Sequence, residues 1–188
     1  MLKNMSKPDV KNSIWKELWE YIKMIIFVVA VVLVVNNFLL INARVPSESM
    51  ENTIMTGDRF FGNRLAYLFD DPERFDIVVF KYPDDESQLF VKRVIGLPGE
   101  TVEIKDGKVY INEQELTDDI YGITDYIDIP GIAEEPLTLK ADEYFCLGDN
   151  RPESFDSRYA EVGPVHRADI VGKVWIRIWP LKKFGAVE

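Results

Sequence analysis

A long apolar run near the amino terminus constrains this chain more than any other stretch. Residues 21–41 are almost all apolar, interrupted by Lys23 near the start and by Asn36-Asn37 towards the end. A helix rises about 1.5 Å per residue, so a run of this length crosses a hydrocarbon core of roughly 30 Å. We therefore predict a transmembrane helix at residues 21–41, preceded by a cytoplasmic segment at residues 1–20.

Two alternatives to a membrane anchor are a cleaved targeting sequence and a buried core helix. The apolar core of a cleaved targeting sequence spans about 7–15 residues, fewer than here, and no small-x-small cleavage site follows this run. A helix that is apolar all round, with Trp15 and Trp19 on its flank, favours the bilayer over a protein core. The sequence therefore indicates an anchor that stays attached.

Charge predicts the orientation of this anchor and excludes one class of function. The formal net charge is −10, and residues 1–41 hold five lysines against three acidic residues. This balance of +2 leaves −12 on the remaining residues. Because a lysine excess before an anchor stays inside, we expect residues 42–188 to be extracytoplasmic at the cell membrane. The acidic remainder lacks the clustered Lys and Arg that phosphate binding needs, so no nucleic acid is expected as a partner.

The scarcity of cysteine and histidine argues against disulfides and zinc sites. Cys146 and His166 are the only residues of their types in the sequence, so neither an internal disulfide nor a zinc cluster is expected. No glycine-rich phosphate loop precedes a helix. We therefore expect no cofactor and no metal.

Beyond the anchor, the patterning is typical of strands and turns. Asp106-Gly107 suits a type I′ turn, and a hairpin closed around it pairs Ile104 with Val109 on one face. Further β-rich runs that end at turn residues predict strands at residues 76–82, 88–95, 143–147 and 169–179. The sequence therefore predicts a mainly β domain.

The predicted domain organisation follows from these runs. Residues 42–188 form one extracytoplasmic domain of antiparallel sheets. An acidic, turn-rich stretch separates its two groups of strands and predicts a small inserted subdomain. The expected divisions are a core at residues 42–104 and 143–180, and an excursion at about residues 105–142.

The residues that could carry chemistry are serines and one lysine. Phe90, Lys92 and Val94 share a strand face, because side chains two residues apart point the same way. Apolar neighbours withdraw a lysine amine from water and lower its pKa, as a general base requires. The alternative is a lysine that extends from the sheet edge into solvent. A Ser-His-Asp triad would need His166, which lies in a turn-like context, and no carboxylate pair stands out for an acid–base hydrolase.

Four segments occur in an order that resembles the signature of a known family. They are Ser47-Glu-Ser49-Met50, Gly57-Asp58-Arg59, Lys92-Arg-Val-Ile-Gly-Leu-Pro-Gly-Glu100 and Gly148-Asp-Asn-Arg-x-x-Ser154-x-Asp156-Ser157-Arg158. With the amino-terminal anchor, they resemble the ordered boxes of the type I signal peptidases, the membrane serine proteases that remove signal peptides. The single anchor and short excursion are similar to the compact Gram-positive form, which implies a signal-peptidase-like catalytic domain.

This resemblance implies roles for particular residues. Ser49 corresponds to the nucleophile, and Lys92 to the general base that takes its proton. Ser47 corresponds to a hydroxyl that helps the Ser49 backbone N–H stabilise the oxyanion, and Ser154 to a serine that hydrogen-bonds and orients the lysine. Structural support beside the site is implied for Asp149 and for a salt bridge between Asp156 and Arg158.

The resemblance also implies partners. These are preprotein signal peptides with small residues at positions −1 and −3, the lipid bilayer, and the nearby secretion machinery. In the family, Met50 and the apolar surface near the nucleophile face the membrane. We hypothesise that Phe60 and Phe61 extend that surface.

One residue departs from the family pattern. The family usually reads Ser-Met-x-Pro-Thr, and Asn52 stands at the proline position here. Asparagine tolerates turn geometries but lacks the fixed φ of proline, so we expect a looser turn with catalysis retained.

Two other functions stay open. A self-cleaving repressor-type protease would share the Ser-Lys dyad, although the anchor and the absence of a DNA-binding module argue against it. A catalytically weak or silent membrane-tethered β domain that binds exported proteins is the other alternative.

Overall fold

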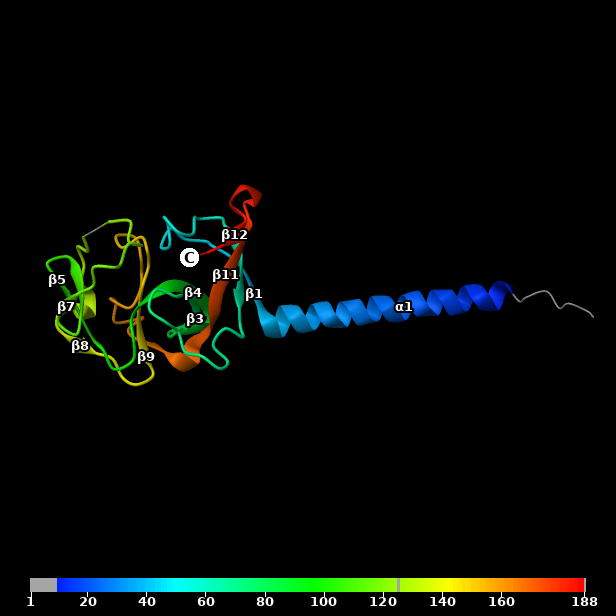
Figure 1. The fold of residues 1–188 in the computed structure, drawn as a ribbon, viewed down its shortest axis with the longest axis horizontal. Coiled ribbons are helices and arrows are strands. Elements are labelled where there is room, and N and C mark those ends of the chain that lie inside the picture. Colours follow the sequence, from blue (N-terminus) through cyan, green and yellow to red (C-terminus); the bar gives the residue numbers. More distant parts are fainter. Residues whose placement is uncertain (1–9, 125, 188) are drawn as a thin grey trace, which may run out of the picture. The chain divides into compact units, whose positions relative to one another are not determined.

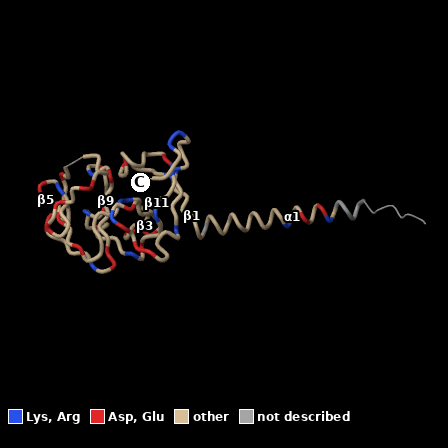
Figure 2. The backbone as a smooth tube through the Cα atoms, viewed as in Figure 1, with Lys and Arg blue, Asp and Glu red and all other residues tan. Residues whose placement is uncertain are grey.

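The computed structural model describes residues 10–124 and 126–187, and the chain divides into two compact units at Leu39/Leu40 (Figure 1). The first unit holds helix α1, Val10–Val34, followed by a π-helical turn, Val35–Leu39. The described charged residues of α1 lie towards its amino-terminal end (Figure 2), and residues 24–34 are exposed and apolar. In the described part of the chain, no helix combines the length and the apolar character needed to cross a membrane.

The helical unit ends earlier than predicted. We expected a helix through residue 41, but Leu40 and Ile41 belong to strand β1, Leu40–Arg44. Ile41 lies opposite Gly62 and is 3% exposed, and a Cβ on Gly62 would come within 3.2 Å of the Ile41 side chain. Hydrogen bonds to β2 and packing in the β core therefore favour the strand conformation of these two apolar residues over continuation of the helix.

Eight antiparallel strands form the large sheet of the second unit. Its order is β1-β2-β11-β3-β4-β9-β10, and β12 pairs with β11. Besides β1, the strands are β2 Arg59–Asn63, β3 Ile77–Tyr82, β4 Asp85–Gly96, β9 Glu143–Leu147, β10 Val165–His166, β11 Ile170–Trp179 and β12 Gly185–Ala186. The four predicted strand runs match β3, β4, β9 and β11 within a few residues.

A second, four-stranded sheet has the order β7-β6-β5-β8. Its strands are β5 Thr101–Lys105, β6 Lys108–Ile111, β7 Gln114–Glu115 and β8 Leu137–Thr138. The predicted register of the β5–β6 hairpin is confirmed, with Ile104 opposite Val109. This sheet begins at Thr101, a few residues before the expected start of the excursion, because β5 pairs with β6 and β8 and not with the large sheet.

Short 3-10 turns connect these strands. They are η2 Gly131–Ala133, η3 Arg167–Asp169 and η4 Leu181–Lys183. Gly131 has a φ of +61°, and a Cβ there would lie 2.1 Å from the Arg158 carbonyl oxygen. Only glycine allows the η2 turn to approach the loop after β9 this closely.

Strand β4 changes its surroundings along its length. Residues 85–89 are exposed, whereas residues 92–96 are buried. Among the described residues, β4 pairs with β9 only from Arg93 onward, so the earlier half has β3 on one side and an unpaired edge on the other. Lys92 is the first buried residue of β4 and directly precedes the part of the strand that pairs with β9.

The buried residues that the structure describes in the second unit form three clusters. One contains Val102 and Ile111 of the small sheet together with Phe145 and Leu147 of β9, so it joins the two sheets. Another contains Met50 and Phe60, which are both 1% exposed. The hypothesis that Phe60 and Phe61 extend an apolar, membrane-facing surface is wrong for Phe60, because its side chain, like that of Met50, fills the core beneath the loop between β1 and β2. Phe61, the next residue on β2, is half-buried.

Replacement of Phe145 tests whether the shared core holds the two sheets together. Phe145 is fully buried, so we expect Phe145→Ala to lower the free energy of unfolding by about 3–5 kcal/mol. Trp175→Ala is the matched control, because Trp175 is 55% exposed. Denaturant unfolding of the detergent-solubilised protein measures both. A loss below about 1 kcal/mol for Phe145→Ala would contradict this role of the cluster.

Candidate active site

Ser49 lies in the loop that connects β1 to β2. At the base of this loop, the Val45 N–H donates to the Asp58 carbonyl and the Gly57 N–H donates to the Val45 carbonyl, each at 2.9 Å. On the other side, the Asn150 N–H donates to the Ser49 carbonyl at 3.1 Å. These bonds fix the backbone around Ser49, whose side chain is largely buried at 8% exposure.

Asn52 gives this loop a backbone geometry that proline does not adopt. Its φ is +87°, in the left-handed region, whereas proline holds φ near −65°. Asparagine enters the left-handed region more readily than most residues. The turn is closed, since the N–H groups of Thr53 and Ile54 donate to the Met50 carbonyl at 3.2 and 2.7 Å. Asn52 therefore suits the turn that this chain forms.

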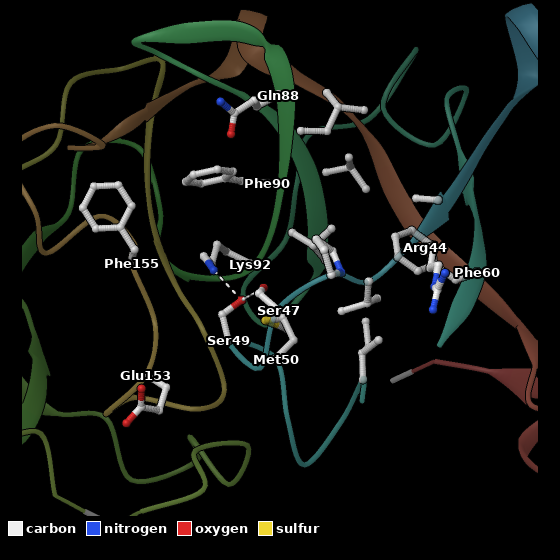
Figure 3. Close-up of a pocket in the computed structure, with 17 residues that line it drawn as sticks. Arg44, Ser47, Ser49, Met50, Phe60, Gln88, Phe90, Lys92, Glu153 and Phe155 are labelled. Atoms are coloured by element: carbon white, nitrogen blue, oxygen red, sulfur yellow. Dashed lines mark hydrogen bonds between the residues drawn. The ribbon is translucent and has the colours of Figure 1, made fainter. Parts of the chain in front are cut away.

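Ser49 and Lys92 are in direct contact. The Lys92 Nζ donates a hydrogen bond to the Ser49 Oγ at 2.7 Å (Figure 3). Lys92 is 4% exposed, and its amine lies 5.7 Å from the centroid of the Phe90 ring. Burial lowers the pKa of Lys92 from 10.5 to about 8, because the apolar surroundings disfavour the charged amine. The alternative of a lysine extended into solvent is not what the structure shows.

A buried ion pair next to Lys92 limits the electrostatic attraction on its amine. The Arg158 Nε lies 2.8 Å from the Asp156 Oδ1, and both side chains are at most 2% exposed. Asp156 raises the pKa of Lys92 and Arg158 lowers it. Since the two charges oppose each other, desolvation remains the dominant influence on this pKa. The sequence-predicted pairing of Asp156 with Arg158 is present.

The two remaining predicted serines occupy different settings. The Ser47 Oγ lies 3.3 Å from the Ser49 Oγ in the exposed part of the loop. Ser154 is 2% exposed, and within the described residues its Oγ has no hydrogen-bond partner. The hydrogen bond that was expected from Ser154 to Lys92 is therefore not formed here.

Asp149 belongs to a polar network that supports the loop that carries Ser49. Its carboxylate accepts two hydrogen bonds from Arg93, at 2.9 and 2.8 Å, and one from the Thr53 Oγ1 at 2.5 Å. The neighbouring Asn150 donates through its Nδ2 to the Glu48 carbonyl at 3.1 Å. Two chain segments, one before Ser49 and one after it, are thus tied to the loop that follows β9.

Arg93, Thr53 and Asn150 were not singled out from the sequence. One signal could have identified Arg93, since it stands between Val91 and Ile95 on one strand face, as Lys92 does on the other. Thr53 and Asn150 carry no such pattern, because their partners are distant in sequence and become neighbours only in the fold.

A cavity of about 310 Å³ opens beside the Ser49–Lys92 contact (Figure 3). Residues 43–47 and 88–92 contribute much of its lining, which is mostly apolar. Glu153 and Phe155, from the loop after β9, also line it. The cavity lies between a strand with an unpaired edge and the segment that leads to Ser49.

His166 lies away from this cavity. It is exposed in β10, its Nδ1 lies 3.2 Å from the Asp142 Oδ2, and it is not among the residues that line the cavity. Of these two side chains, Lys92 is the one in contact with Ser49.

Comparison with known proteins identifies the family. The family described as "Signal peptidase, peptidase S26" matches residues 18–179. The chain therefore belongs to the signal peptidase family, peptidase S26.

Several relatives match over most of their length. The probable signal peptidase I-2 of Synechocystis sp. is 34% identical over 185 residues, which cover 95% of this chain and 80% of the relative. The signal peptidase I of Leptolyngbya laminosa is 37% identical, with 89% and 83% covered. The signal peptidase I V of Bacillus subtilis is 36% identical, with 78% and 92% covered. A crystal structure of a signal peptidase I from Enterococcus faecalis is 37% identical and aligns with 55% of this chain and 97% of that chain, at a TM-score of 0.44.

Proline at residue 52 tests the backbone geometry of the loop that carries Ser49. Because Asn52 has a positive φ, we expect Asn52→Pro to destabilise the protein by more than about 1 kcal/mol. Asn52→Gly accommodates the same φ and is expected to stay within about 0.5 kcal/mol of the parent. Denaturant unfolding measures both. Equal stability of Asn52→Pro and the parent would show that the loop takes a different backbone geometry.

Proposed function

We propose that this chain is a single-pass membrane serine endopeptidase that removes signal peptides from exported preproteins with a Ser49–Lys92 dyad. The observation that carries the proposal is the 2.7 Å contact between the Lys92 amine and the Ser49 hydroxyl in an apolar setting. With a pKa near 8, roughly a tenth of the molecules hold a neutral amine at pH 7. A neutral amine at this distance can accept the Ser49 proton.

The reaction proceeds in two halves. In the first, Lys92 takes the Ser49 proton while the Ser49 Oγ attacks the scissile carbonyl carbon. The resulting ammonium returns the proton to the leaving amine as the C–N bond breaks, which leaves the signal peptide esterified to Ser49. In the second, Lys92 takes a proton from water, the hydroxyl attacks the ester, and the Ser49 oxygen recovers its proton on leaving.

The developing oxyanion needs donors close to Ser49. We assign the Ser49 backbone N–H and the Ser47 hydroxyl to this role. The position of the Ser47 Oγ, 3.3 Å from the nucleophile, supports the assignment. Ser154 is assigned to orient Lys92, because its Oγ is buried and has no other hydrogen-bond partner among the described residues.

The substrate is proposed to bind as an added strand along residues 88–92 of β4. This part of β4 has an unpaired edge, and main-chain hydrogen bonds along such an edge hold an extended peptide. Side chains two residues apart then enter the same side of the cavity. Small residues at positions −1 and −3 are proposed from the family resemblance, and their apolar side chains suit the mostly apolar lining of the cavity.

Helix α1 is proposed to anchor the enzyme in the cell membrane, with the amino terminus inside. The exposed apolar residues 24–34 and the lysine excess in residues 1–41 support this topology. An anchored enzyme meets a substrate that is held in the same bilayer by its own apolar segment, which raises the effective concentration at the site. The nearby secretion machinery is the proposed source of these substrates.

Cleavage of a purified precursor tests the proposed function. We expect the detergent-solubilised parent to cut after a small-x-small sequence, and Ser49→Ala and Lys92→Ala to lower kcat by about 10³-fold or more. Ser87→Ala and Lys81→Ala are matched controls, because both residues lie on β3 or β4 and are not part of the cavity. Normal cutting by Lys92→Ala would disprove the base assignment. Precursors left intact by the parent would favour a tethered binding domain.

A further inference from the structure

Tyr121, in the excursion, covers the buried guanidinium of Arg93. The Cζ of Arg93 lies 3.6 Å from the centroid of the Tyr121 ring. The ring also lies beside Phe75, at 5.3 Å between centroids. Aromatic faces attract cations, and the attraction is strongest where water is excluded. Arg93 is 1% exposed, so water is excluded from this contact.

The edges of the Arg93 guanidinium are already occupied. Its Nε and Nη2 donate to the Asp149 carboxylate, its Nη1 donates to the Phe75 carbonyl at 2.8 Å, and its Nη2 also donates to the Thr53 Oγ1 at 3.2 Å. Planar donors of this kind interact further only through their faces. The Tyr121 ring therefore supplies a contact that the hydrogen-bonding groups around Arg93 do not.

Two other contacts tie the same part of the excursion to the loop after β9. The Ile123 N–H donates to the Asp149 carbonyl at 2.8 Å. The Arg151 Nη2 donates to the Asp119 Oδ2 at 2.7 Å, while the Arg151 Nε donates to the Gly148 carbonyl at 2.9 Å. Residues 119–123 thus lie against the segment that carries Asp149.

The Arg93–Asp149 pair is linked to both catalytic side chains. Arg93 follows Lys92 directly on β4, and Asp149 accepts the Thr53 hydroxyl from the turn just after Ser49. Asn150, next to Asp149, donates to the Ser49 carbonyl. A shift of Arg93 would therefore move the base and the nucleophile relative to each other.

We propose that Tyr121 is a positioning residue, which holds Arg93 and Asp149 so that Ser49 and Lys92 stay in reacting geometry. The excursion is then part of the catalytic scaffold and not an accessory subdomain. Tyr121 touches neither the cavity nor the reacting atoms, so it acts through Arg93. This inference rests on the proposed function, because its effect appears in the cleavage step.

Steady-state cleavage of a precursor tests the role of the Tyr121 ring. We expect Tyr121→Leu to lower kcat about tenfold or more, because a small misplacement of reacting groups has a large effect on rate. KM should stay within about twofold, since the cavity is unchanged. Tyr121→Phe keeps the aromatic face and should restore a parental kcat. Ile120→Ala is the matched control, because the neighbouring Ile120 is 78% exposed.

Fluorinated phenylalanines at residue 121 provide a second test, which keeps the shape of the ring and so preserves folding. Fluorine withdraws charge from the ring face, so kcat should fall stepwise as fluorine atoms are added. If the parent cleaves the precursor, a parental kcat in Tyr121→Leu would overturn the positioning role. A kcat that does not change as fluorine atoms are added would overturn it as well. A parent that does not cleave would overturn the proposed function, and this inference with it.

Discussion

The withdrawal of the Lys92 amine from water is the condition on which the site depends. It lowers the pKa of Lys92 from 10.5 to about 8, at a cost in stability on the order of 3 kcal/mol when the amine is charged in both states. Below pH 8 this cost is fully present. Between pH 8 and 10.5 the unfolded chain binds the proton more tightly than the folded one, so the cost falls as pH rises, and above 10.5 it is gone. Burial of Lys92 therefore lowers the stability of the fold at neutral pH and leaves part of its amine neutral there.

Two buried ion pairs flank the buried Lys92 and fix the positions of the side chains around it. Asp156 alone would raise the pKa of Lys92, and Arg158 offsets it. On the opposite face of β4, Arg93 and Asp149 hold the loop after β9 against the Ser49 turn. Buried pairs add little net stability compared with apolar residues, but losing one partner leaves an uncompensated charge. We propose that their contribution here is to orient Ser49 and Lys92.

Strands and the hairpin register could be predicted from local sequence patterns. The end of the helix and the burial of individual side chains could not, because they depend on tertiary contacts. Period-two alternation placed Lys92 among apolar neighbours, and Asp106-Gly107 predicted the register of its hairpin. The helix end was wrong, because Leu40 and Ile41 gain more from the β core than from continuing an apolar helix. Met50 and Phe60 were expected at a surface but are buried, because the loop before β2 folds over them. Tyr121 could not be found from patterning, since nothing local distinguishes a tyrosine in an acidic, turn-rich stretch.

A measured pKa of Lys92 would show whether this amine can be neutral at working pH. Protein labelled with ¹³C at the lysine ε-carbons can be titrated by NMR in detergent micelles, with Lys92→Met used to assign the Lys92 signal. We expect a midpoint near pH 8 for Lys92, well below the midpoints of the exposed lysines. A midpoint near 10.5 would mean that the amine stays charged at working pH, and Lys92 would then not be the base.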